Sequence, residues 1–211
     1  MTDFSDLRAV PYSPTIPRGL DANMGMDALA AYWRGLCRGG ALPRRSDLDP
    51  RRIAAVLPNT FILEKIAPGL ARFRVAGTHL ADLMGMDVRG MPVGCLIAPD
   101  GRDRFATALV RLFDEPTTLR LDLRSKGGLG RPELGARMVL LPLRNDLGDT
   151  SRALGCLVAE GALGHAPRRF AITGLRANPL ATMPAPERVP PGDDARPYPR
   201  LATCDGAPVR P

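Results

Sequence analysis

Histidine and cysteine, the side chains best suited to ligate metals or to act as base and nucleophile, are few in this sequence: two and four. No pair of cysteines has the C-x-x-C spacing of a metal or redox site. Neither His79 nor His165 lies in a G-x-S-x-G or comparable motif that would pair it with a nucleophile. The glycine run at residues 127–130 lacks the Gly-Lys-Ser/Thr of a phosphate-binding loop, so a hairpin turn explains it better. We therefore predict a protein that is not an enzyme and holds no metal.

His79 and Cys95 lie near the expected starts of two helices. His79 follows Thr78, a good N-cap for a short helix that Gly85 would end. A histidine there could ligate a haem iron, but we expect it to hydrogen-bond locally or to face solvent. Cys95 precedes the apolar pair Leu96-Ile97, and we expect a buried apolar cysteine.

The net positive charge of the chain suggests nucleic-acid or membrane partners, but the distribution of the charges along the sequence does not support them. The net charge is +7 and the isoelectric point is about 9.9, values typical of nucleic-acid or membrane binding. The arginines are spread along the chain, whereas a nucleic-acid-binding face needs them clustered, so a nucleic-acid partner is not expected. The first residues carry no apolar signal segment, and no run approaches the ~18 apolar residues of a membrane span. We therefore expect a cytoplasmic protein with reduced thiols and no membrane contact.

Hydrophobic periodicity and turn residues predict the elements that position these side chains. The predicted helices cover residues 27–38, 79–84 and 103–114. The predicted strands lie near residues 60–66, 71–77, 118–124, 136–143 and 153–159. In the second of these strands, Phe73 and Val75 are expected on one face because alternate residues of a strand share a face.

The two ends of the chain differ from the middle. Residues 1–24 carry several prolines and little periodicity, which predicts a flexible arm. Residues 171–211 are rich in proline and poor in aliphatic clusters, which predicts a largely disordered tail. The folded domain is therefore expected over residues 25–170.

Four motifs follow one another from the first helix to the end of the second strand. The aromatic pair Tyr32-Trp33 lies on the helix, and residues 42–50 then read L-P-R-R-S-D-L-D-P. Residues 57–59 read L-P-N before the first strand, and residues 74–78 read R-V-A-G-T at the end of the second. In this order the chain resembles a bacterial subfamily of stand-alone PAS-domain proteins, and the likeness extends more loosely to about Ala159.

The resemblance implies a fold and a class of function. The fold would be α+β, a PAS-like five-stranded antiparallel sheet with helices on one face and an N-terminal helix, the first two strands lying between the later ones. The function would be sensory or regulatory without catalysis, with a small apolar or mixed ligand and a signalling partner in trans. The residues expected to face the ligand are Phe73, Val75, Leu83, Met84, Phe105, Leu109, Leu121 and Met138. The alternative is that they form a filled core and that the protein is purely a protein–protein interaction module.

The cofactors known in PAS domains are not expected here. Haem-binding members take their histidine from the longer helix, and residues 103–114 contain none. The Asn-Cys-Arg-Phe-Leu-Gln pattern of flavin photosensors is replaced around Cys95 by G-C-L-I, and the chain contains no glutamine. We predict a colourless protein without haem or flavin.

The N-terminal helix and Arg74 each allow two interpretations. Leu29, Tyr32, Trp33 and Leu36 form an apolar stripe, which either packs on the domain or forms a homodimer interface. Arg74 is expected to pair with a carboxylate such as Asp47 or Asp49, or else to recognise an anion at the pocket mouth.

Overall fold

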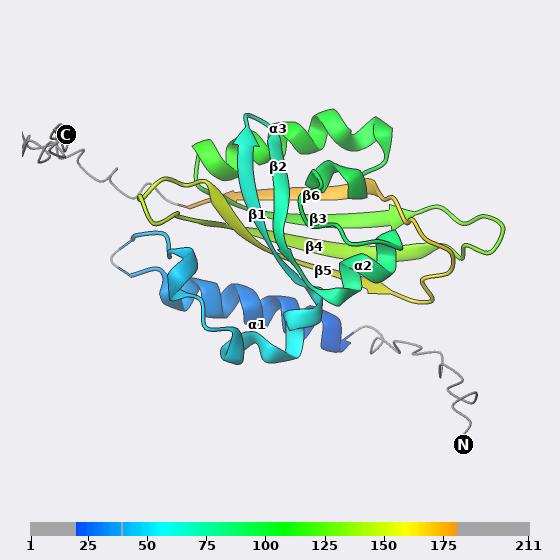
Figure 1. Cartoon of the computed structure of the whole chain (residues 1–211), viewed down its shortest axis with the longest axis horizontal. Helices are drawn as coiled ribbons and strands as arrows, with labels where there is room; N and C mark the ends of the chain where they lie inside the picture. Colours follow the sequence, from blue (N-terminus) through cyan, green and yellow to red (C-terminus); the bar gives the residue numbers. More distant parts are fainter. Residues whose placement is uncertain (1–19, 39, 181–211) are drawn as a thin grey trace, which may run out of the picture. The chain divides into compact units, whose positions relative to one another are not determined.

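Residues 20–38 and 40–180 are described by the structure, a computed structural model. They fold around an antiparallel sheet with the strand order β2-β1-β5-β4-β3-β6 (Figure 1). The strands are β1 (Thr60–Ala67), β2 (Leu70–Ala76), β3 (Thr117–Ser125), β4 (Leu134–Leu143), β5 (Arg152–Glu160) and β6 (Ala171–Pro179). The α-helices are α1 (Leu20–Leu36), α2 (Thr78–Met84) and α3 (Arg102–Asp114). Short 3-10 segments connect them: η1 (Arg45–Asp47), η2 (Pro50–Asn59), η3 (Val93–Leu96) and η4 (Pro99–Gly101).

The α+β class and the five predicted strands are confirmed, but the sheet has a sixth strand. β6 pairs with β3 along its whole length and lies in the segment predicted as tail. The side chains of β6 are half-buried or exposed. A strand of this kind does not need buried apolar residues, and the sequence of β6 lacks the strong apolar alternation of the other strands. Pairing with a distant strand stabilises β6, and periodicity within the segment cannot reveal such pairing.

Three further expectations about the domain need correction. α1 begins at Leu20, inside the predicted arm, and β6 extends the domain beyond residue 170. β2 and β1 lie at one edge of the sheet and not between the later strands. The predictions of flexibility for residues 1–19 and of disorder for residues 181–211 lie outside the described residues.

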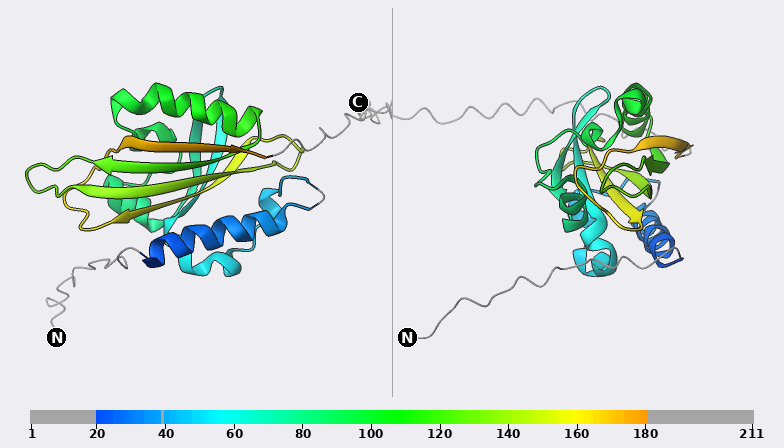
Figure 2. Two further views of the ribbon diagram at one scale, coloured as in Figure 1. Left: turned by 180° about the vertical axis from the view of Figure 1, so that it is seen from behind. Right: turned by 90° about the vertical axis from the view of Figure 1, so that its right-hand side faces the viewer.

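The sheet is covered on both faces, not on one. α3 contacts β3 and β4 on one face, whereas α1 contacts β4 on the other (Figure 2). Successive residues of β4 alternate between the two cores: Leu140 belongs to the core beneath α3, and Val139 and Leu141 to the core beneath α1. Strands buried on both faces read as continuous apolar runs, as residues 138–143 do.

The apolar stripe of α1 is part of the domain core. Leu29 and Trp33 are each 1% exposed and pack with Val139, Leu141 and Leu154 of the sheet. The Trp33 indole Nε1 donates a hydrogen bond to the Pro142 carbonyl oxygen, 3.0 Å away. Of the two interpretations of the stripe, the homodimer interface is therefore wrong for Leu29 and Trp33, because these side chains cover the second face of the sheet. Tyr32 and Leu36 are half-buried at the edge of the same packing.

A β-bulge in β2 separates Phe73 from Val75. Val75 is opposite Ile62 and Phe73 is opposite Leu63, with a register shift between them at Arg74. The extra residue reverses the alternation, so Phe73 enters the core beneath α3 while Val75 lies on the α1 side and is 46% exposed. The expectation that both side chains point the same way is wrong.

Arg74 pairs with Glu64 and not with Asp47 or Asp49. Its Nε lies 3.2 Å from the Glu64 carboxylate, which Arg72 Nε also contacts at 2.9 Å and Arg152 contacts on its other oxygen. Partial burial disfavours the charged carboxylate, but the hydrogen bonds from Arg152 and Arg72 and the charges of Arg152 and Arg74 outweigh it. The pKa of Glu64 is therefore lowered. Arg74 acts as a structural pairing residue between β1 and β2.

Candidate ligand-binding groove

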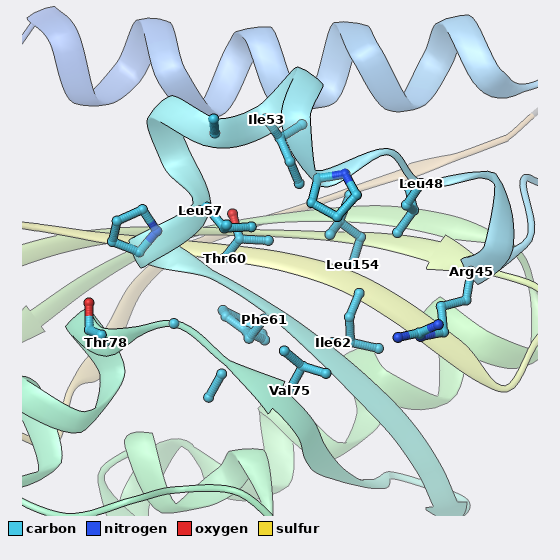
Figure 3. Close-up of a pocket in the computed structure, with 15 residues that line it drawn as sticks. Arg45, Leu48, Ile53, Leu57, Thr60, Phe61, Ile62, Val75, Thr78 and Leu154 are labelled. Carbon is cyan, nitrogen blue, oxygen red and sulfur yellow. The ribbon is translucent and has the colours of Figure 1, made fainter.

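An open groove of about 660 Å³ lies between η2 and the β1–β2 hairpin (Figure 3). Its walls are the kinked 3-10 segment on one side and the two strands on the other. Most of the side chains that line it are apolar; they include Leu48, Ile53, Leu57, Phe61, Ile62, Val75 and Leu154. The groove lies on the α1 side of the sheet, the face on which Ile62 and Leu154 pack.

The wall formed by η2 is held in place by α1. Pro50 starts the segment, and the Asp49 carboxylate caps it by accepting a hydrogen bond from the Arg51 backbone N–H at 3.0 Å. The Asp49 backbone N–H donates to the Tyr32 hydroxyl oxygen at 2.7 Å. The Arg52 guanidinium lies 5.9 Å from the centroid of the same tyrosine ring. Tyr32 on α1 therefore positions the segment that forms the wall.

The far end of the groove depends on a close approach of two chain segments. A Cβ atom added to Gly77 would lie 2.1 Å from the Pro58 carbonyl oxygen, so this position cannot hold a larger residue without rearrangement. The Gly77 backbone N–H donates to the Thr60 carbonyl oxygen at 2.9 Å. The Thr60 hydroxyl in turn donates to the Val56 carbonyl oxygen at 2.8 Å. The motif at residues 57–59 thus packs directly against the motif at residues 74–78.

Arg45 is the charged residue among the described residues that line the groove. Its side chain extends toward Ile62 and Val75 (Figure 3). No carboxylate in residues 20–38 and 40–180 forms an ion pair with Arg45. Thr78 lies at the opposite end of the groove and adds a hydroxyl. This arrangement can hold an apolar body and one acidic group; it offers no base or nucleophile from histidine, cysteine or a carboxylate among the lining residues described.

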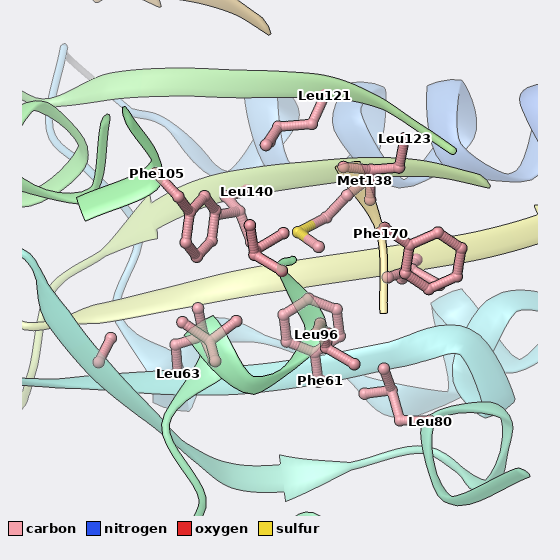
Figure 4. Close-up of a cluster of buried hydrophobic side chains, with 14 of the residues drawn as sticks. Phe61, Leu63, Leu80, Leu96, Phe105, Leu121, Leu123, Met138, Leu140 and Phe170 are labelled. Carbon is pink, nitrogen blue, oxygen red and sulfur yellow. The ribbon is translucent and has the colours of Figure 1, made fainter. Parts of the chain in front are cut away.

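The residues predicted to surround a ligand are mostly packed together as core. Phe105, Leu121 and Met138 lie among Phe61, Leu63 and Leu140 in the cluster of Figure 4. All of the predicted residues except Val75 are buried in this cluster: Phe73, Leu83, Met84, Phe105, Leu109, Leu121 and Met138. Phe105 and Leu109 also line a cleft of about 380 Å³ beside Cys95. Val75 is the predicted residue that lines the groove.

His79 is buried and makes a long-range contact, so the expectation of a local or solvent-facing histidine is wrong. The Ala159 backbone N–H donates to His79 Nε2 at 3.3 Å. Burial lowers the pKa of His79, and the nearby Asp82 charge opposes this only in part. A neutral imidazole that accepts from β5 is a structural connection between α2 and the sheet.

Cys95 and Cys156 are poor nucleophiles in their surroundings. Burial raises the pKa of Cys95, which is half-buried. Burial also raises the pKa of Cys156 to about 12, against a smaller opposing effect of a hydrogen bond with Thr60. Within the described residues, no group of three or more histidine, cysteine, aspartate or glutamate side chains is placed to hold a metal ion. No helix in that part of the chain is long and apolar enough to span a bilayer.

Most of the groove is not predicted by the sequence, although part of its wall is. The spacing of Ile53, Val56 and Leu57 predicts a short helical turn closed by Pro58, and the structure has a 3-10 segment there with a kink at Ile53, but the spacing does not show that these side chains line a groove. A signal was nonetheless present in the motifs themselves. Residues 42–50 supply Arg45 and Leu48, and residues 57–59 supply Leu57 and Pro58.

Comparison with known proteins finds one matching family model and a solved structure of low similarity. The family model described as "PAS domain" matches residues 22–158, which include α1, η2 and the strands β1–β5 up to residue 158. A solved structure, "The light state structure of the blue-light photoreceptor Aureochrome1 LOV", is similar with 13% identity and a TM-score of 0.37, covering 53% of this chain and 88% of that one. No curated protein matches the sequence. Since the family model matches well over half of the chain, the protein belongs to the PAS-domain family.

Proposed function

We propose that this PAS domain is a non-catalytic sensory or regulatory module that binds a small, mainly apolar ligand with one acidic group in the η2–β1–β2 groove. The observation that carries the proposal is an apolar groove of about 660 Å³ with an arginine that has no carboxylate partner among the described residues. Ligand sites are typically concave, mostly apolar and about 300–1,000 Å³ in volume, with a few polar groups that fix orientation. A guanidinium at one end suits a carboxylate, which it can bind through two hydrogen bonds.

The groove also offers a route by which binding could be communicated. A ligand between η2 and Val75 would hold the segment against the hairpin. Because Tyr32 joins η2 to α1, the position of α1 would respond to occupancy. A cytoplasmic signalling partner in trans would then recognise the outer surface of α1 and η2. A ligand shifts such an equilibrium only by its difference in affinity for the two states.

The proposal is tested with decanoate, an apolar chain with one carboxylate, titrated into isotopically labelled protein and followed by two-dimensional NMR. We expect the largest shifts at Leu57, Ile62, Val75 and Leu154. Val75→Glu should weaken binding at least about tenfold, because it places a like charge and a polar group in the groove. Ile66→Glu is the matched control, since Ile66 is an exposed β-branched residue of β1 outside the groove. Equal affinities for both variants would refute the location.

Arg45 is tested separately with its own control. Arg45→Ala should weaken decanoate binding about tenfold but leave binding of the uncharged decanol nearly unchanged. Arg51→Ala, an exposed arginine on η2 that does not line the groove, should leave both ligands unaffected. Loss of decanol binding in Arg45→Ala would mean that this residue shapes the groove and does not recognise the acid.

A second candidate is docking of a partner protein on the same hairpin. β2 is an edge strand, and its side chains Leu70 and Val75 are exposed together with Ile66 of β1. The outward backbone groups of Phe73 already bond to Gly90 and Met91, so a partner would dock on these exposed apolar side chains and would not add a strand at this point. This function would require Ile66→Glu to abolish partner binding, whereas the ligand function predicts no effect of that variant.

A further inference from the structure

A second cleft, of about 520 Å³, lies where α3 begins. It is formed by η4 and the start of α3, the end of β3, the start of β6 and residues 167–169. Backbone hydrogen bonds fix this arrangement, since the Ala98 N–H donates to the Phe170 carbonyl oxygen and the Phe170 N–H to the Leu96 carbonyl oxygen, each at 2.8 Å. The cleft is lined by six cationic side chains: Arg104, Arg124, Lys126, Arg131, Arg168 and Arg169.

Arg168 is a buried guanidinium with donors that have no partner. Its side chain is 1% exposed, and its Nη2 donates to the Pro132 carbonyl oxygen at 2.6 Å. Among the described residues, its Nε and Nη1 have no hydrogen-bond partner and no carboxylate pairs with it. Taking a charge out of water without a counter-ion is strongly unfavourable. Buried polar groups are normally hydrogen-bonded, so these two donors call for an acceptor that the described residues do not supply.

The other cations of the cleft are in excess over the available carboxylates. Arg124 is paired with Glu133 at 2.7 Å. Arg104, Lys126 and Arg169 form no ion pair with any residue of 20–38 and 40–180. Asp100, the acidic residue among the lining residues described, also forms no ion pair in that part of the chain. Burial lowers the pKa of Arg168, and the positive charge of Arg131 lowers it further.

We propose that this cleft is an anion-binding site that takes the phosphate group of a small soluble phosphomonoester. A phosphate group carries about −1.5 to −2 charges near neutral pH and accepts several hydrogen bonds, which matches a set of guanidinium forks better than a single carboxylate does. Arg168 supplies the buried donors, and Arg104, Lys126 and Arg169 compensate the charge at the rim. Because Arg168 is buried at the base of the cleft, a small soluble phosphate suits the site better than a membrane surface, which would contact only the exposed cations at the rim.

The experiment is isothermal titration calorimetry of the full chain with inorganic phosphate and with glycerol 3-phosphate at constant ionic strength. We expect saturable binding of both at one site per chain. Arg104→Ala should weaken both about tenfold, because one charge-assisted hydrogen bond is lost. Arg104 is exposed on a helix and has no partner within the described residues, so alanine there should preserve the fold. Arg176→Ala removes one arginine charge outside the cleft and should leave the affinity unchanged.

Arg168→Met tests the buried donors directly. It keeps an apolar stem of similar length and should abolish the binding of both phosphates while the protein stays folded by circular dichroism. If this variant does not fold, the Arg104→Ala and Arg176→Ala pair decides the question. Equal binding in wild type, Arg104→Ala and Arg176→Ala overturns the proposal. Binding to vesicles that contain phosphatidic acid, without binding of glycerol 3-phosphate, also overturns it in favour of a membrane contact.

Discussion

The indole nitrogen of Trp33 donates a hydrogen bond to the carbonyl oxygen of Pro142, 3.0 Å away, and so joins α1 to β4. The contact lies in the second core of the domain, where Trp33 packs with Leu141 and Leu143. Because Tyr32 on the same helix holds η2, the position of the groove wall depends on how α1 is seated. The aromatic pair on α1 therefore connects the core to the candidate site.

Trp33→Ala should destabilise the domain and not simply release a partner. Loss of a buried tryptophan side chain typically costs about 3–5 kcal/mol. Urea unfolding followed by circular dichroism measures this change. Trp33→Phe keeps most of the packing but loses the bond to Pro142, so its cost should be smaller, about 1–3 kcal/mol. A Trp33→Ala protein with unchanged stability that sediments as a smaller species would restore the dimer interpretation.

Gly77→Ala should destabilise the domain and disturb the groove. The new methyl group would lie 2.1 Å from the Pro58 carbonyl oxygen, so the two segments at the end of the groove must separate. We expect a loss of about 1–3 kcal/mol, as for other overpacked sites, measured by thermal and urea unfolding. Gly35→Ala is the matched control. A Cβ at Gly35 would meet nothing within 4 Å, and alanine in α1 should stabilise by up to about 1 kcal/mol. Similar effects of both changes would contradict the close approach.

We expect His79 to lower the free energy of unfolding as the pH falls below the ordinary histidine pKa. Burial lowers the folded-state pKa of His79 from 6.5, so the unfolded chain binds the proton more readily. The contribution of neutral His79 is therefore fully present above pH 6.5 and is lost as the pH falls from there toward the lower folded pKa. His79→Gln keeps an acceptor for the Ala159 N–H and should flatten this part of the stability curve. The curve is measured by urea unfolding across pH, and an unchanged slope in the variant would exclude His79 as the cause.

Glu64→Gln should weaken the β1–β2 hairpin. The carboxylate meets Arg72, Arg74 and Arg152, and a neutral amide would leave their repulsion uncompensated. We expect a loss of about 1–2 kcal/mol, between the values for surface and buried pairs. Since the folded-state pKa of Glu64 lies below 4.5, this stability is present above pH 4.5 and is lost as the pH falls through the folded pKa. The difference between wild type and variant should therefore shrink in acid; a constant difference would refute the assignment.

Local sequence was sufficient for the elements that carry their own apolar pattern. β1, β3, β4 and β5 were predictable because alternation and turn glycines mark them. The bulge at Arg74 was not, because it depends on how β2 pairs with β1. β6 was missed for the same reason, since its stability comes from β3. The face on which α1 packs was not predictable either, because a helical period shows an apolar stripe but not its partner.

The candidate groove was harder to predict than the fold. The sequence predicts that Val75 faces a ligand from the same side of β2 as Phe73, and the bulge overturns this premise. Val75 lines the groove only because it points away from Phe73. Arg45 lay in a recognised motif, but its value as a binding residue depends on the absence of a carboxylate partner within the described residues. Whether a carboxylate lies beside Arg45 depends on the three-dimensional packing, which the sequence alone does not show. The residues predicted to surround an interior ligand form the hydrophobic core instead, because their side chains fill the space between α3 and the sheet.

Native mass spectrometry of the purified protein tests the central claim most directly, because it reports any bound small molecule by mass. We predict that wild type carries a non-covalently bound apolar acid, or takes up one decanoate per chain when it is added. Val75→Glu should lose the ligand, whereas Ile66→Glu should retain it. Wild-type protein that shows only the bare chain mass before and after decanoate is added would contradict a ligand-binding groove.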